Sequence, residues 1–139
     1  MDAGEARALF ASARVARLAT VDADRRPHLV PVTFAFDGGE EIVTAVDHKP
    51  KRTTRLRRLE NIEANPRVSV LADHYEDDWS KLWWARADGM AQITEPGASE
   101  HERGISALAA RYPQYVEDRP SDSVIVISVS RWSGWRAAR

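Results

Sequence analysis

The chain has 139 residues, of which 43% are hydrophobic and 29% are charged. This length suits one domain with its own core and is too short for two, so we treat residues 1–139 as a single domain. The 20 Lys and Arg residues nearly balance the 21 Asp and Glu residues, and cysteine is absent, which argues against general nucleic-acid affinity and excludes disulfides and thiolate chemistry.

The first third of the chain predicts a helix followed by three strands. Asp2 and Glu5 have the spacing of an N-terminal capping box, and apolar residues recur behind them at helical spacing. Two β-rich runs follow at 15–21 and 29–36, and a glycine pair marks the turn before a third run at 41–46. We therefore expect three consecutive strands joined by tight connections.

The remainder of the chain mixes helix and strand signals without a regular alternation. Apolar spacing predicts helices over 56–62 and 99–112, and the acidic stretch 73–78 predicts a loop. The β-rich runs predict strands at 68–72, 82–94, 123–130 and 132–137. Strands with mostly short connections indicate an α+β fold that is mainly antiparallel β, a sheet or barrel with a few short helices.

The most informative segment is Lys49–Arg58, which places six cations where a strand ends and a helix begins. A helix start presents unpaired N–H groups and a positive dipole end, and the arginine fork matches phosphate oxygens. The segment therefore favours an anionic group such as a phosphate. A solvated basic helix face is the alternative, and nucleic-acid binding is disfavoured because no aromatic residues are interleaved with the charges.

Other catalytic constellations are not indicated by the sequence. The four histidines are scattered without metal-ligand spacing, and no cysteine accompanies them, so no metal site is expected. No Gly-x-Ser-x-Gly elbow occurs. No long apolar stretch or signal peptide is visible, so we expect a cytoplasmic protein that does not enter a membrane.

Four stretches carry a resemblance to the pyridoxamine 5′-phosphate oxidase-like split β-barrel family. They are residues 16–21 with 26–32, residues 49–52, residues 65–70, and the Asp-Trp pair 78–79 leading to 83–91, which begins with a double tryptophan. Their order and spacing look closest to the actinobacterial branch thought to use the deazaflavin coenzyme F420. The resemblance implies a split β-barrel (the FMN-binding split barrel-like fold) that forms a homodimer, with the cofactor in a groove between the two barrels.

The same resemblance implies where the cofactor lies. Its phosphate is expected against Lys49, Lys51, Arg52, Thr54 and Arg55, with the contacts among the first three open by one position. Its ring system is expected along Pro31, Val32, Thr33, Thr44 and Val46. The second subunit is expected to close the site with an aromatic group, for which Trp79 is the first candidate and Trp83 and Trp84 are the others.

The function that the resemblance implies is hydride transfer between reduced deazaflavin and a small organic substrate. The cofactor supplies the chemistry in such an enzyme, so no catalytic side chain is predicted. The alternatives are an FMN-dependent oxidoreductase of the same fold and a carrier that binds a flavin or deazaflavin without turnover. The chain ends Trp135-Arg136-Ala137-Ala138-Arg139, without the Arg-Leu-x-Pro motif of genuine pyridoxamine phosphate oxidases, which disfavours the vitamin substrate.

Overall fold

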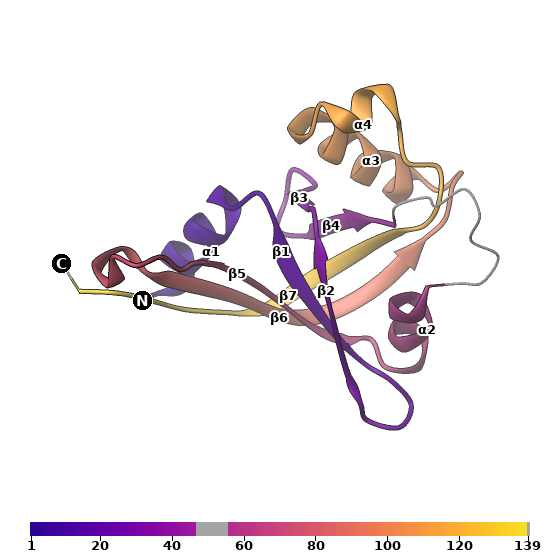
Figure 1. Cartoon of the computed structure of the whole chain (residues 1–139). Coiled ribbons are helices and arrows are strands. Elements are labelled where there is room, and N and C mark those ends of the chain that lie inside the picture. The colour runs from indigo at the N-terminus through magenta and orange to yellow at the C-terminus, as the bar shows by residue number, and fades with distance from the viewer. Residues whose placement is uncertain (47–55, 139) are drawn as a thin grey trace.

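The computed structural model describes residues 1–46 and 56–138 (Figure 1). In chain order its elements are α1 (Ala3–Ser12), β1 (Ala16–Val21), β2 (Pro27–Val32), β3 (Ala35–Phe36), β4 (Ile42–Ala45), α2 (Arg57–Ala64), β5 (Arg67–His74), the 3₁₀ turn η1 (Trp79–Lys81), β6 (Trp83–Thr94), α3 (Ser99–Arg111), α4 (Gln114–Glu117) and β7 (Val124–Arg136). No helix in these two ranges is long and apolar enough to cross a membrane.

The described strands form one curled sheet in the order β2-β1-β5-β6-β7-β4-β3, and every neighbouring pair is antiparallel. The long strands β6 and β7 form its centre, and the short strand β3 and the hairpin strand β2 are its two edges (Figure 1). This open antiparallel half-barrel with a few short helices confirms the predicted split β-barrel.

Two strand predictions differ from the structure in detail. The run predicted as one strand at 29–36 is interrupted at Phe34, whose N–H and carbonyl both lie within hydrogen-bond distance of the Tyr112 hydroxyl instead of a neighbouring strand. The two strands predicted after residue 123 are the single strand β7. A register shift opposite Asp88 and Gly89 leaves Ser130 as an extra residue, which bends β7 without ending it.

The main core lies between α1 and the middle of the sheet. The Asp2 carboxylate accepts a 2.8 Å hydrogen bond from the Glu5 N–H, and this bond lowers the pKa of Asp2, as expected for a helix cap. Behind that cap Phe10 is fully buried, with its ring centroid 4.6 Å from that of Phe34 and 5.2 Å from that of Trp132. The cap and this aromatic cluster together fix α1 on the sheet.

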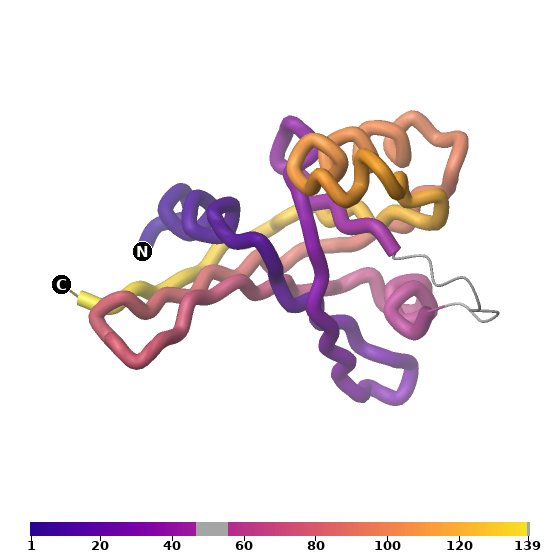
Figure 2. Tube along the Cα trace, turned by 45° about the horizontal axis from the view of Figure 1, so that its top comes forward, coloured from indigo at the N-terminus to yellow at the C-terminus, as the bar shows by residue number. Residues whose placement is uncertain are grey.

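Two further helices cover other parts of the sheet. α3 packs on β4, where Ile105 and Leu108 form a second apolar cluster with Val43. α2 packs on β1 through a buried hydrogen bond of 2.9 Å from the Asn61 amide to the Thr20 hydroxyl. Figure 2 shows α1 and α2 near opposite ends of the molecule, with α3 over the β3–β4 side. This arrangement leaves a hollow between the ends of β2 and β4 and the start of α2.

Candidate cofactor site

The hollow between β2, β4 and α2 is a pocket of about 200 Å³, which we call the ring pocket. Its walls are formed by Val15, Pro31, Val32, Thr33, Ala45 and Arg58. Most of these side chains are apolar or carry a single hydroxyl, and one cation stands at the edge contributed by α2. Such a surface suits one face of a flat heterocycle with an anionic group beside it.

Backbone pairing and one tyrosine pair position the walls of the ring pocket. Val32 lies opposite Ala16 in the β1–β2 register, so Val15 comes beside the end of β2. Thr33 then leaves the sheet, and its hydroxyl lies 2.8 Å from the hydroxyl of Tyr115. The neighbouring Tyr112 hydroxyl lies 2.8 Å from the Phe34 carbonyl. The C-terminal end of α3 and the residues after it therefore hold the β2–β3 link in place.

The structure brings together three of the five predicted ring contacts. Pro31, Val32 and Thr33 all line the ring pocket. Thr44 and Val46 are buried and are absent from its lining, and the Val46 N–H is already donated to the Ser123 carbonyl at 3.1 Å. The β4 residue that lines the pocket is Ala45, which lies between them, and the assignment of Thr44 and Val46 to the ring stays a prediction.

Three lining residues were missed in the sequence analysis. Ala45 could not have been found from strand alternation, because all four residues of β4 are buried. Arg58 belongs to the basic segment, and it is the one lining cation among the residues that the structure describes. Val15 precedes β1, and no sequence signal distinguished it.

The predicted phosphate contacts lie outside the described residues. This holds for Lys49, Lys51, Arg52, Thr54 and Arg55, so their assignment stays a prediction. The chain leaves the described part after Val46, beside the ring pocket, and returns at Leu56, just before α2. The N-cap residue of α2 is Leu56, and its side chain makes no hydrogen bond to the helix. The side chain of the N-cap residue therefore does not occupy the N–H groups of the first turn.

The predicted aromatic contacts Trp79, Trp83 and Trp84 lie apart from the ring pocket of their own chain. Trp79 is 76% exposed in η1, within the turn that joins β5 and β6. Figure 1 shows this turn beside the two chain termini, at the opposite end of the sheet from α2. Trp84 is half-buried, and the Arg86 guanidinium lies 5.6 Å from its ring centroid. None of the three tryptophans lines the ring pocket within one chain.

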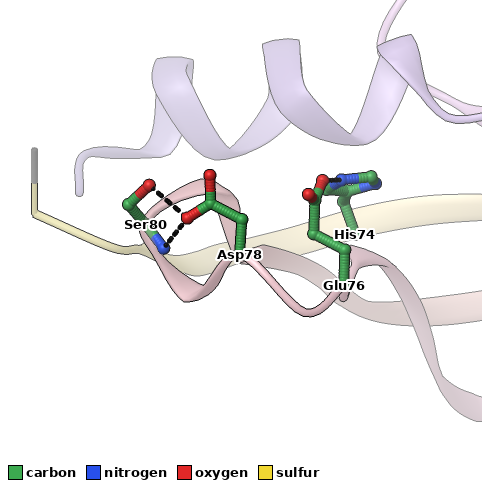
Figure 3. A network of polar contacts seen from close by, with 4 residues as sticks. All are labelled: His74, Glu76, Asp78 and Ser80. Carbon is green, nitrogen blue, oxygen red and sulfur yellow. Dashed lines mark hydrogen bonds and ion pairs between the residues drawn. The ribbon is translucent and has the colours of Figure 1, made fainter.

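The turn that carries Trp79 is held by its own polar contacts (Figure 3). The Asp78 carboxylate accepts hydrogen bonds from the Ser80 N–H at 3.1 Å and from the Ser80 hydroxyl at 2.7 Å. Nearby, the ring of His74 contacts the carboxylate of Glu76. These contacts fix the path of the turn, and the indole that it presents remains in solvent. No group of His, Asp and Glu suited to a metal ion occurs in residues 1–46 and 56–138.

The open antiparallel half-barrel and its pocket beside a strand end define the chain as a split β-barrel protein. The family model described as pyridoxamine 5′-phosphate oxidase matches residues 3–136. The chain therefore belongs to the pyridoxamine 5′-phosphate oxidase family.

Solved structures of the same fold include proteins that bind different groups. A conserved protein of Mycobacterium tuberculosis is 25% identical, with a TM-score of 0.75 over 98% of this chain and 85% of its own. An FAD-binding protein from Mesorhizobium loti is 20% identical, with a TM-score of 0.73 over 96% and 92%. The heme storage protein HutZ of Vibrio cholerae is also 20% identical, with a TM-score of 0.72 over 98% and 95%.

Proposed function

We propose that this chain is a coenzyme F420-dependent oxidoreductase that holds the deazaflavin between the two subunits of a homodimer. The ring pocket supports this proposal best. Its apolar wall beside Pro31 and Val32 would receive one face of the ring, and Arg58, which ends the basic segment in the sequence, would contact the phosphate. The bound deazaflavin would supply hydride transfer to a small organic substrate, and the chain would position the ring and exclude water.

The size of the ring pocket favours a second subunit. Ligand pockets usually enclose roughly 300–1,000 Å³, whereas the ring pocket of one chain encloses about 200 Å³. One chain therefore covers only part of a flavin-sized molecule. Leu29 is 66% exposed on β2, and Trp79 is 76% exposed at the far end of the sheet. A second copy would cover such apolar surface and would bring its own Trp79 to the open side of the pocket.

A titration tests the cofactor directly. We expect coenzyme F420 to quench the tryptophan fluorescence of the purified protein saturably and more tightly than FMN, with a dimeric mass in sedimentation. Tighter binding of FMN would show that FMN is the cofactor and would leave the assignment of the ring pocket unchanged. Preference for hemin, which the likeness to a heme storage protein makes a necessary third ligand, would overturn the proposal.

Charge reversal of the basic segment tests the phosphate contacts. We expect the double variant Lys51→Glu, Arg55→Glu to weaken F420 affinity at least about 100-fold, because two charge-assisted hydrogen bonds of about 1.5–3 kcal/mol each are lost. The control is Arg103→Glu, an exposed change on α3. Calorimetric titration of both variants with F420 measures the effect. Equal F420 affinities of the double variant and the control would contradict the phosphate assignment.

Replacement of Trp79 tests the contribution of the second subunit. We expect Trp79→Ala to weaken F420 binding about tenfold through lost ring stacking, without lowering the thermal stability of the chain, because the indole is 76% exposed. Val116→Ala, an exposed apolar change on α4, is the control. If Trp79→Ala binds F420 as tightly as Val116→Ala does, then Trp79 does not close the site.

A further inference from the structure

A second and larger cleft lies on the other side of Val15 from the ring pocket. It encloses about 670 Å³ between the end of α1, the start of β1 and the β5–β6 turn. We call it the arginine cleft, and it is lined by Ser12, Ala13, Arg14, Val15, Arg17, Asp73, His74, Tyr75 and Trp83. Val15 lines both cavities, so a ligand in one lies beside a ligand in the other.

The first cation of the arginine cleft is held in place by the end of α3. One terminal nitrogen of the Arg14 guanidinium donates a 3.1 Å hydrogen bond to the Arg111 carbonyl, and the guanidinium carbon lies 4.7 Å from the ring centroid of Tyr112. The Tyr112 hydroxyl also donates to the backbone carbonyl of Arg14 at 3.0 Å. Both the backbone and the charge of Arg14 are thus positioned without any carboxylate.

The second cation, Arg17, lies on β1 opposite a residue of the ring pocket. Arg17 is exposed on β1 and lies opposite Pro31 of β2 in the strand register. Because Pro31 lines the ring pocket and Arg17 lines the arginine cleft, the two sites are neighbours across one strand pair. Within residues 1–46 and 56–138, neither Arg14 nor Arg17 forms an ion pair.

The remaining lining groups leave the arginine cleft with a net positive charge. Asp73 contributes one negative charge against the two guanidinium groups. His74 contacts Glu76, whose carboxylate is not among the lining groups, and with a neutral imidazole this pair carries one negative charge beside the cleft. Val15 and Trp83 supply apolar surface, and Tyr75 offers a hydroxyl. A cavity with surplus arginine charge and an apolar wall suits a carboxylate on an apolar body.

We propose that the arginine cleft binds the carboxylate of a small organic anion through Arg17 and Arg14, with the apolar part of that anion directed past Val15 toward the ring pocket. This carboxylate site rests on the proposed function, and it assigns the substrate class as an apolar carboxylic acid. Arg17 determines the specificity, because its side chain is exposed and free to pair with the ligand, whereas Arg14 is a fixed second charge.

Fluorine NMR with 4-fluorobenzoate and 4-fluorobenzamide as probes tests the carboxylate site. The two molecules have similar shape and differ in charge. We expect the full-length protein to bind the benzoate at least tenfold more tightly than the amide, and Arg17→Gln to remove that preference while amide affinity stays unchanged. The tenfold figure follows from a charge-assisted hydrogen bond of at least about 1.4 kcal/mol. Arg131→Gln, an exposed change on β7, is the control.

The outcomes separate this proposal from the cofactor assignment. Equal binding of both probes to the wild type, no saturation with the benzoate up to about 10 mM, or an unchanged preference in Arg17→Gln would overturn the carboxylate site. F420 affinity is titrated on the same samples, and we expect it to be equal in the wild type and Arg17→Gln. A chain that fails to bind F420 and still prefers the benzoate through Arg17 would retain the carboxylate site and lose the proposed cofactor.

Discussion

Replacing Gly89 by alanine is expected to lower the free energy of unfolding by about 3 kcal/mol or more. A Cβ atom at this position would lie 2.2 Å from the Ser128 carbonyl oxygen, 3.0 Å from the Ser128 carbonyl carbon and 3.1 Å from Cα of Val129. All three atoms belong to the backbone of β7, so the strand itself would have to move. Overpacking costs typically 1–3 kcal/mol and more where the neighbours are rigid.

The position of Gly89 in the sheet explains why the strands cannot simply separate. β6 and β7 are the longest paired strands, and their register shifts between Asp88 and Gly89. The Ser130 hydroxyl donates a 3.0 Å hydrogen bond to the Asp88 carbonyl beside this bulge. A methyl group here would therefore disturb the bulge that bends the centre of the half-barrel.

Urea unfolding of matched alanine variants measures the effect of the Gly89 change. Gly39→Ala is the control, because its added Cβ would lie 3.5 Å from the Asp37 carboxylate, an ordinary contact. We expect a much lower midpoint for Gly89→Ala and a change within about 0.5 kcal/mol for Gly39→Ala. Equal midpoints for the two variants would show that β7 can shift to make room for the side chain.

The sequence predicted the fold well because hydrophobic periodicity determines most of its elements. The α1 cap at Asp2 and the strands β1, β4 and β6 follow directly from local patterns. The break between β2 and β3 could not be predicted, because it depends on Tyr112, which is 78 residues away from Phe34 in sequence. Likewise, the continuity of β7 through Ser130 depends on pairing with β6.

The candidate site was predictable only where it follows a single strand. Pro31, Val32 and Thr33 are consecutive, so any placement of the ring at the end of β2 includes them. The choice between Ala45 and its neighbours required the face of β4, which is buried on both sides in a four-residue strand and shows no alternation. The arginine cleft combines residues from four elements, α1, β1, β5 and β6, and only the tertiary structure brings these together.

Replacing Arg111 by methionine is expected to destabilise the chain by about 2–4 kcal/mol and to weaken ligand binding in the ring pocket. The Arg111 guanidinium donates to the Phe34 carbonyl at 3.1 Å and to the Ala11 carbonyl at 3.0 Å, and it also contacts the Ala13 carbonyl. Methionine keeps much of the side-chain volume but removes this donor from the Ala11 and Ala13 carbonyls, whereas the Phe34 carbonyl keeps the Tyr112 hydroxyl. Each buried unsatisfied acceptor costs about 1–3 kcal/mol, without strict additivity.

Arg111 links the stability of the chain to the candidate site. Burial lowers the pKa of its guanidinium, which nevertheless stays protonated at neutral pH, and the charge lies 4.5 Å from the ring centroid of Phe34. Two of its acceptors, Ala11 and Ala13, precede Val15, which lines both cavities, and the third, Phe34, follows Thr33, which lines the ring pocket. Loss of the guanidinium therefore removes the contacts of the Arg111 side chain to these two backbone segments, and the contacts of the Tyr112 hydroxyl remain.

Thermal unfolding and F420 titration of Arg111→Met, each at temperatures where the variant remains folded, measure the two effects separately. Arg119→Met is the control, since its guanidinium pairs with Glu102 at 3.3 Å on the exposed surface, where such pairs contribute at most about 1 kcal/mol. If Arg111→Met is destabilised but binds F420 as the wild type does, the arginine holds α3 to α1 without positioning the pocket. If both properties decline while those of Arg119→Met do not, the end of α3 positions the walls of the ring pocket.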